Sequence, residues 1–298
     1  MFFRARPLGT LFLTALLACA ITTIAAASPR THHRHHTIHA ASRHHRRFRN
    51  PPGGCYARAA IVVDPATNQV LFDKNADSSV PIASLSKLMT AMVFLDQNPD
   101  LSRSVVVSRE DWKGAGHTQL RVGEVVELRD LLHMSLMCSD NCATRTLARE
   151  SGLPDSEFLA QMNRKASMLG MTHTHFVEST GLDERNVSTA ADVARMLRAA
   201  AAIPLIRQIS TTREYHFLSA RRQHAIRNTD RLLYGNRYEI LGGKTGFISE
   251  AGYCFATWIR TEGREMIAVV LGAPTAATRF ADTVRLVQRA TTVSLTQP

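Results

Sequence analysis

The sequence is poor in long apolar segments, since only one stretch, at the N-terminus, is apolar enough to enter a membrane. This scarcity excludes a polytopic membrane protein. Internal repeats and a glycine-rich phosphate-binding loop are also missing, and residues 55–298 lack the cysteine and histidine spacing typical of a zinc site. A repeat protein, a P-loop nucleotide-binding protein and a zinc protein are therefore not expected. We predict neither a cofactor nor a metal site in residues 55–298.

Acidic residues are absent from residues 28–50, and this gap accounts for much of the positive charge of the chain. The formal net charge is +11, of which arginines before residue 50 contribute eight units, so that residues 51–298 carry only +3. A nucleic-acid-binding domain would distribute lysine and arginine over its folded surface. A nucleic-acid partner is therefore not expected.

Residues 1–27 are typical of a secretory signal peptide. Arg4 and Arg6 precede an apolar stretch at residues 8–24, and the alanines at 25–27 offer small residues for cleavage. The alternatives are an uncleaved membrane anchor and a lipoprotein signal that ends at Cys19. In each case the pattern predicts export across the inner membrane.

Residues 28–54 are rich in histidine and arginine, with seven of the thirteen histidines of the chain. The segment has too few apolar residues to fold alone, so we predict a disordered basic tail and linker that contacts the anionic cell envelope. Metal binding by the histidines is the alternative, although no fixed ligand spacing is visible.

Strand-like segments lie at both ends of residues 55–298, and helical patterns lie between them. We therefore expect an α/β (α+β) fold, with an antiparallel sheet built from the N- and C-terminal segments and a helical insertion. The expected strands are Ala59–Val63, Gln69–Phe72, Gly252–Ile259 and Glu265–Leu271. One expected helix starts at Ser84. The others cover Leu128–Met137, Asn141–Ser151, Ser156–Leu169, Thr189–Ala202 and Ala276–Ala290.

Four cysteines remain after the leader, namely Cys55, Cys138, Cys142 and Cys254. An even number in an exported protein permits disulfides, and four cysteines allow three pairings. A domain of this size does not need disulfides for stability. The sequence leaves the state of these cysteines open.

The first motif with catalytic potential is Ser84-Leu85-Ser86-Lys87, at an expected helix start. An i, i+3 spacing places Ser84 and Lys87 on one helix face, so that the amine can reach the hydroxyl. A serine nucleophile needs an adjacent base, and lysine can act as one when burial or a second cation lowers its pKa. Taken alone, the string is better explained by helix capping by Ser84 with a solvated Lys87.

Two further strings carry the same kind of ambiguity. Ser139-Asp140-Asn141 lies between two expected helices, where each of these residue types also favours an N-cap. Lys244-Thr245-Gly246 precedes the C-terminal hairpin, where the glycine lets another backbone lie close to the strand and the lysine and threonine can engage a carboxylate. Taken alone, the third string is also compatible with a simple turn.

Together the three strings are far more specific, because each occurs once, in this order, with separations of 55 and 105 residues. The set resembles the penicillin-recognising serine enzymes, which include DD-peptidases and serine β-lactamases. Residues 81–91 and 244–253 are similar to the low-molecular-mass penicillin-binding proteins of the D-alanyl-D-alanine carboxypeptidase and endopeptidase family. The resemblance covers about residues 56–286 and implies a β-lactamase/DD-peptidase-like fold, a serine DD-peptidase domain over residues 55–298 and a periplasmic location.

The resemblance implies a catalytic role for residues of all three motifs. Ser84 would attack the carbonyl that follows a D-alanine, forming an acyl-enzyme that water then hydrolyses. Lys87 would be its general base. Ser139, together with Lys244, would relay a proton to the leaving amine.

The resemblance also implies a set of substrate-binding residues. Asn141 would hold the amide of the acyl donor, and Thr245 would help to bind the terminal carboxylate. Arg279 would bind that carboxylate too, and its alternative is a solvated arginine at the start of the final helix. The backbone N–H groups of Ser84 and Phe247 would form the oxyanion hole. The full predicted binding set is Asn141, Lys244, Thr245, Gly246, Phe247 and Arg279.

Several functions within and beyond the family stay open. No Glu-x-x-Leu-Asn string lies between Asn141 and Lys244, so efficient serine β-lactamase activity is not expected, whereas slow acylation by β-lactam inhibitors is. Residues 120–123 and 171–176 resemble the endopeptidases, which cut peptidoglycan cross-links, more than the carboxypeptidases, which remove D-alanine from stem peptides. The alternative from another class is a catalytically idle envelope-binding protein that works through its basic tail.

Overall fold

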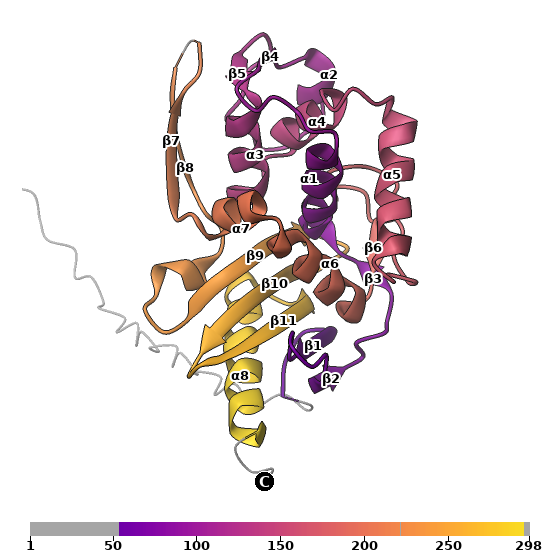
Figure 1. Cartoon of the computed structure of the whole chain (residues 1–298), viewed down its shortest axis with the longest axis vertical. Coiled ribbons are helices and arrows are strands. Elements are labelled where there is room, and N and C mark those ends of the chain that lie inside the picture. Colours follow the sequence, from indigo (N-terminus) through magenta and orange to yellow (C-terminus); the bar gives the residue numbers. More distant parts are fainter. Residues whose placement is uncertain (1–53, 221, 295–298) are drawn as a thin grey trace, which may run out of the picture. The chain divides into compact units, whose positions relative to one another are not determined.

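Five strands form a single antiparallel sheet in the order β2-β1-β11-β10-β9 (Figure 1). Strands β1 (Ala59–Val63) and β2 (Val70–Lys74) come from the N-terminal end of the domain. Strands β9 (Glu239–Ile248), β10 (Gly252–Thr261) and β11 (Arg264–Ala273) come from its C-terminal end. The two ends of the domain therefore meet in one sheet, which confirms the predicted architecture.

This computed structural model describes residues 54–220 and 222–294. The predicted signal peptide (residues 1–27) and the basic tail, apart from Gly54, lie outside the described residues. In the described ranges, no helix has the length and apolar character needed to cross a bilayer.

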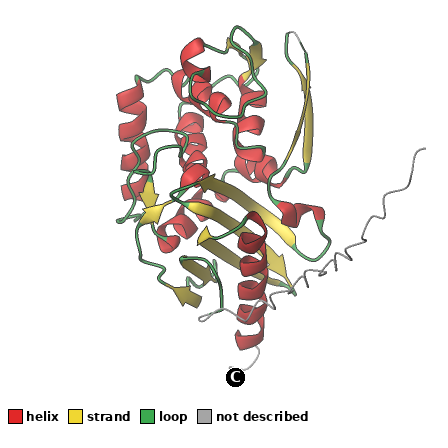
Figure 2. Ribbon diagram, turned by 180° about the vertical axis from the view of Figure 1, so that it is seen from behind, coloured by secondary structure: helices red, strands yellow, loops and turns green. Residues whose placement is uncertain are grey.

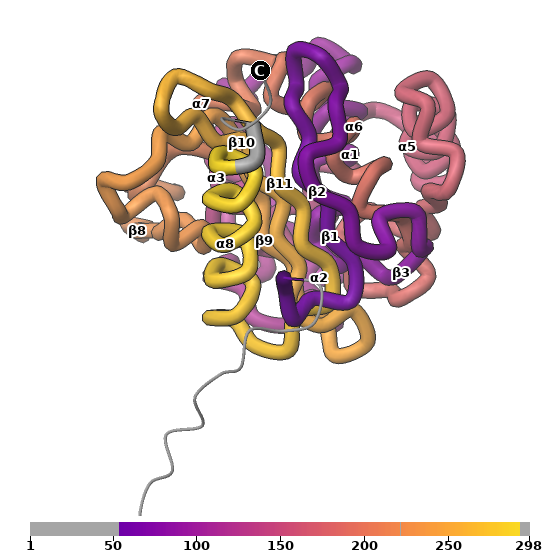
Figure 3. The backbone as a smooth tube through the Cα atoms, turned by 90° about the horizontal axis from the view of Figure 1, so that it is seen from below, coloured from indigo at the N-terminus to yellow at the C-terminus, as the bar shows by residue number. Residues whose placement is uncertain are grey.

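The sheet separates two apolar cores because alternate residues of each strand point to opposite faces. In β1, Ala59 and Ile61 belong to the larger core, whereas Ala60 and Val62 belong to the smaller one. Helix α8 (Ala276–Ser294) covers the face with the smaller core, as Figures 2 and 3 show. The helical insertion covers the other face.

The insertion between β2 and β9 carries the helices that surround the larger core (Figure 1). Its α-helices are α1 (Ser86–Asp96), α2 (Arg109–Trp112), α3 (Leu128–Met137), α4 (Asn141–Arg149), α5 (Asp155–Met168), α6 (Ala190–Ala202) and α7 (Pro204–Thr211). Two 3₁₀ turns, η1 (Ala83–Leu85) and η2 (Arg231–Tyr234), complete the helical elements in the described residues.

Three pairs of short strands join these helices. They are β3 (Val80–Pro81) with β6 (Val187–Ser188), β4 (Ser104–Val106) with β5 (Val125–Glu127), and β7 (Glu214–Leu218) with β8 (Gln223–Arg227). The β7–β8 hairpin extends along α3 in Figure 1. Neither this hairpin nor α7 was predicted from the sequence.

The cysteines of the described residues are all free thiols. Cys55, Cys142 and Cys254 are buried, and Cys138 is half-buried. The structure thus answers the question that the sequence left open, and packing rather than cross-linking holds these segments together.

Candidate active site

Ser84 lies in a 3₁₀ turn that precedes helix α1, and not in the first turn of the α-helix as predicted. The difference arises at Ala83, whose φ of 49° is left-handed and incompatible with a continuous helix. The turn is held in place by Gly181, because a Cβ at that position would lie 1.9 Å from the Ala83 carbonyl oxygen. Close packing of the loop at residues 178–181 therefore fixes the backbone next to Ser84.

Lys87 is completely buried, and its amine has three polar neighbours. The Nζ atom lies 2.8 Å from the Ser84 hydroxyl and 2.6 Å from Asn141 Oδ1. It also lies 2.6 Å from the carbonyl oxygen of Thr180. A neutral amine has two N–H donors and one lone pair, so the amide and carbonyl oxygens can take the donors and leave the lone pair for the serine proton.

Burial lowers the pKa of Lys87 to about 7, against the opposing effect of the Glu178 and Asp140 carboxylates. A lysine at its ordinary pKa is protonated at neutral pH and has no lone pair to accept a proton. With a pKa near 7, a substantial fraction of the Lys87 side chains is neutral. The environment therefore permits Lys87 to act as a base.

The three residues of Ser139-Asp140-Asn141 have different functions in the structure. Asp140 is the N-cap of α4 and accepts a hydrogen bond from the Ala143 amide, as the capping hypothesis suggested. Asn141 instead bonds Lys87, and its Nδ2 donates to the Ala115 carbonyl. Ser139 has a left-handed φ of 65°, which turns the chain between α3 and α4.

Strand β9 brings the third motif to the other two. Lys244 is buried, and its Nζ donates to Ser139 Oγ and to the Thr245 carbonyl, each at 2.9 Å. Burial, followed by the positive charge of Lys87, lowers the pKa of Lys244 well below its usual range. The Thr245 hydroxyl lies 2.6 Å from that of Thr229, which follows the β7–β8 hairpin.

Gly246 explains how β9 can lie so close to the serine turn. A Cβ at this position would be 3.0 Å from the Ile82 carbonyl oxygen and 3.1 Å from the Ser84 amide nitrogen. The predicted need for a glycine at a close backbone approach is met here. Phe247 follows at the end of the motif, half exposed and stacked on Tyr253.

Arg279 lies behind β9 and is nearly buried. Its Nη1 donates to the Gly246 carbonyl at 3.1 Å, and its guanidinium lies over the Tyr253 and Phe280 rings. Burial lowers the pKa of this arginine from its ordinary value. These contacts support the strand next to Ser84, and a role for Arg279 in binding a substrate carboxylate stays a prediction.

Sequence reasoning missed several residues that complete the site. Thr180 contributes only its carbonyl oxygen, and no side-chain pattern announces such a contact. Glu178 accepts bonds from the Thr180 amide and hydroxyl, at 2.7 and 2.6 Å, and so shapes that loop. Thr229 is the third residue that was missed. Its hydroxyl contacts that of Thr245, and the β7–β8 hairpin, which was not predicted, brings it there.

The structure therefore joins all three motifs, because Lys87 contacts Asn141 of the second motif and Lys244 contacts Ser139. A buried lysine beside a hydroxyl, together with backbone amides at a helix start, is suited to acyl transfer through a covalent serine intermediate. Among the described residues, no group of histidine, cysteine and acidic side chains could hold a metal ion.

Comparisons with known proteins agree with this geometry. A family model described as D-alanyl-D-alanine carboxypeptidase (Peptidase_S11) matches residues 46–275. The chain is 39% identical over 232 residues to a D-alanyl-D-alanine endopeptidase of Pseudomonas aeruginosa, covering 76% of this chain and 75% of that protein. It is 38% identical over 233 residues to the Escherichia coli protein of the same name, with the same coverage.

A solved structure shows the same fold. Penicillin-binding protein D2 from Listeria monocytogenes, in a cefotaxime-bound form, is 33% identical and superposes with a TM-score of 0.71, covering 81% of this chain and 99% of that one. The family match and the identity to the two endopeptidases support the same assignment. The chain belongs to the D-alanyl-D-alanine carboxypeptidase family of serine peptidases.

Proposed function

We propose that this protein is a serine DD-peptidase that cleaves peptidoglycan stem peptides through an acyl-enzyme on Ser84. The observation that carries the proposal is the buried Lys87 amine 2.8 Å from the Ser84 hydroxyl. In the first step Lys87 takes the hydroxyl proton as Ser84 Oγ bonds to the D-alanyl carbonyl carbon. The peptide C–N bond then breaks, and the leaving amine receives a proton through Ser139 and Lys244. Water attacks the resulting ester and releases the acid.

We propose the binding roles that the family resemblance implies. The Asn141 side chain and the edge strand β9 would hold the acyl donor as an additional strand. The backbone amides of Ser84 and Phe247 would form the oxyanion hole, beside the close contact at Gly246. Thr245 and Arg279 would receive the terminal carboxylate of a peptide or a β-lactam.

Endopeptidase activity on D-alanyl cross-links is favoured over carboxypeptidase activity. The two relatives described above, which are 38% and 39% identical, are both named endopeptidases. The catalytically idle alternative has no support in the site, because every motif residue is present and in contact.

The experiment combines fluorescent penicillin labelling of the purified chain with intact mass analysis, and the Ser84→Ala variant is its control. We expect one covalent adduct on the wild type and none on the variant. Digestion of cross-linked muropeptides then separates the two activities, since an endopeptidase yields monomers and a carboxypeptidase releases D-alanine. A well-folded wild-type chain without an adduct would refute the proposal.

The location of the enzyme is proposed separately, on the leader at residues 1–27 and the charge of residues 28–54. We propose export to the periplasm, where the substrate lies, and contact of the basic tail with anionic envelope components. Cell fractionation tests the location. Salt-sensitive binding to isolated sacculi, lost when residues 28–54 are deleted, tests the tail.

A further inference from the structure

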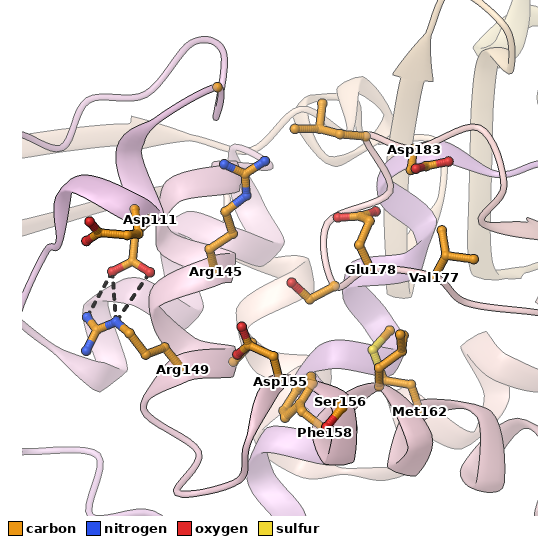
Figure 4. A pocket seen from close by; sticks show the side chains of 16 residues that line it. Asp111, Arg145, Arg149, Asp155, Ser156, Phe158, Met162, Val177, Glu178 and Asp183 are labelled. Atoms are coloured by element: carbon orange, nitrogen blue, oxygen red, sulfur yellow. Dashed lines mark hydrogen bonds and ion pairs between the residues drawn. The ribbon is translucent and has the colours of Figure 1, made fainter.

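A cavity of about 730 Å³ lies beside the catalytic centre and has no role in the proposed chemistry. Figure 4 shows its walls, with Asp111 and Arg149 on one side and Glu178 and Asp183 on the other. Phe158 and Met162 of α5 form an apolar floor (Figure 4). Three further apolar residues, Ala148, Leu159 and Val177, also line the cavity.

The cavity shares two loops with the catalytic centre. Glu178 lines the cavity, and the loop that it shapes supplies the carbonyl oxygen next to Lys87. Gly114 lines the opposite wall, and the next residue, Ala115, accepts a hydrogen bond from Asn141. A peptide bound at the catalytic centre therefore has the cavity within reach of its neighbouring residues.

Two arginines of α4 line the cavity, and they differ in their partners. Arg149 is saturated, because it forms ion pairs with Asp111 and Glu150 and also donates to a backbone carbonyl. Arg145 donates only to the carbonyl oxygen of Lys113, at 2.7 Å, and forms no ion pair with any described residue. The half-buried guanidinium of Arg145 thus has donors left for an anion from outside the protein.

The acidic residues that line the cavity form no ion pair with Arg145. Both oxygens of Glu178 accept bonds within their own loop, and Asp183 pairs with Arg185 at 2.6 Å. Glu110 and Asp155 are exposed at the rim and form no ion pair within the described part of the chain. The cavity therefore offers an unpaired cation in the middle, an apolar floor and unpaired carboxylates at the rim.

We propose that this cavity is a subsite for a carboxylate-bearing segment of the peptidoglycan stem peptide. Arg145 pairs with the free carboxylate, the floor takes methyl and methylene groups, and the rim carboxylates of Glu110 and Asp155 face an ammonium group. A diamino acid of a stem peptide carries all three chemical features. The inference rests on the proposed function, and it names the part of the substrate that would be read outside the catalytic centre.

The test uses the Ser84→Ala chain, which cannot turn over, and two forms of one cross-linked muropeptide. One form has a free diamino-acid carboxylate, and the other has that carboxylate amidated. We expect the free form to bind about tenfold more tightly by calorimetry, the size of one charge-assisted hydrogen-bond pair. Adding Arg145→Ala should reduce this ratio to about one, whereas the matched Arg164→Ala control on α5 should retain it. Ser156→Trp, which fills the cavity from its exposed rim, should weaken binding of both forms.

Penicillin acylation, measured on the chain with Ser84 intact, distinguishes binding at the subsite from an indirect effect of Arg145 on the catalytic centre. The charge of Arg145 opposes protonation of Lys87, so Arg145→Ala should move the inflection of the acylation profile to higher pH and leave the plateau rate above it unchanged. A lower plateau rate would show that Arg145 shapes the catalytic centre itself. That result, or an unchanged ratio of the two muropeptides, would overturn the subsite. Absence of acylation in the wild type would instead refute the proposed function itself.

Discussion

Two serine–lysine contacts meet at the catalytic centre, and their surroundings differ. Lys87 lies on helix α1 and is 2.8 Å from the Ser84 hydroxyl. Lys244 lies on strand β9 and is 2.9 Å from the Ser139 hydroxyl. Both amines are buried, and burial is the main reason that the pKa of each lies below its ordinary value.

The charges around the two lysines separate their functions. Glu178 and Asp140 oppose the effect of burial on Lys87, which holds its pKa at about 7. For Lys244 the strongest charge effect is repulsion from Lys87, which lowers its pKa further. Burial therefore lowers the pKa of a lysine and favours its neutral form. Nearby carboxylates raise the pKa again and so decide whether the lysine can gain and lose a proton near neutral pH. On this basis we propose Lys87 as the base and Lys244 as a relay partner.

The largest expected effect comes from removing the nucleophile, which tests whether the two serine–lysine contacts have different functions. Ser84→Ala deletes the hydroxyl beside Lys87, and we expect acylation by penicillin to fall by about 10⁴-fold or more. Stopped-flow fluorescence and intact mass measure the loss. Ser139→Ala is the matched control, since it removes the hydroxyl of the other contact and should still form the adduct. An adduct on Ser84→Ala would place the nucleophile elsewhere.

Removing the base should have the next largest effect. Lys87→Ala should slow acylation by about 10³-fold, within the range of a lost general base. Circular dichroism should show a folded chain. Lys113→Ala, which removes an exposed lysine, serves as the control and should acylate at the wild-type rate. Near-normal acylation by Lys87→Ala would contradict the assignment of the base.

The relay should matter less, and it should matter more for peptides than for penicillin. Ser139→Ala breaks the contact with Lys244, and we expect about a 10²-fold loss in kcat for muropeptide cleavage. The loss with penicillin should be smaller, because opening of its strained ring depends less on protonation of the leaving nitrogen. Equal losses with both substrates would show that Ser139 shapes the site rather than relaying a proton.

The pH dependence of acylation tests the pKa difference directly. Because the base must be neutral, the rate should fall about tenfold per pH unit below pH 7 and reach a plateau above it. Glu178 favours the protonated form of Lys87, so Glu178→Gln should move the inflection to lower pH. A profile without an inflection near 7, or a Glu178→Gln shift to higher pH, would contradict the electrostatic argument.

Local sequence patterns predicted most of the fold correctly. Strand β1 and helix α3 have the bounds that the patterns predicted, Ala59–Val63 and Leu128–Met137. The missed β7–β8 hairpin also carries a period-two signal, since Phe217, His224 and Ile226 are buried between exposed neighbours. Helix α7 was also missed; it begins at Pro204, directly after the expected helix that ends at Ala202.

The site was predicted unevenly for a physical reason. Ser84 and Lys87 belong to a short sequence motif, and their i, i+3 spacing predicts that their side chains lie close together. The Thr180 carbonyl and the orientation of Arg279 depend on how distant segments pack, and local spacing contains no record of that packing. The left-handed backbone at Ala83 also depends on such packing, since Gly181, far along the sequence, lies against the Ala83 carbonyl.

The smallest predicted effect concerns the contact that brings the two halves of the site together. Gly246→Ala would place a Cβ 3.0 Å from the Ile82 carbonyl oxygen and 3.1 Å from the Ser84 amide. Strand β9 would have to shift by a few tenths of an ångström, so we expect acylation to slow by about tenfold, the change that accompanies ~1.4 kcal/mol of lost transition-state stabilisation. Gly235→Ala is the control, because the nearest atom to its Cβ would be 3.7 Å away. If both variants acylate at the wild-type rate, the close approach of β9 does not limit the geometry of the oxyanion hole.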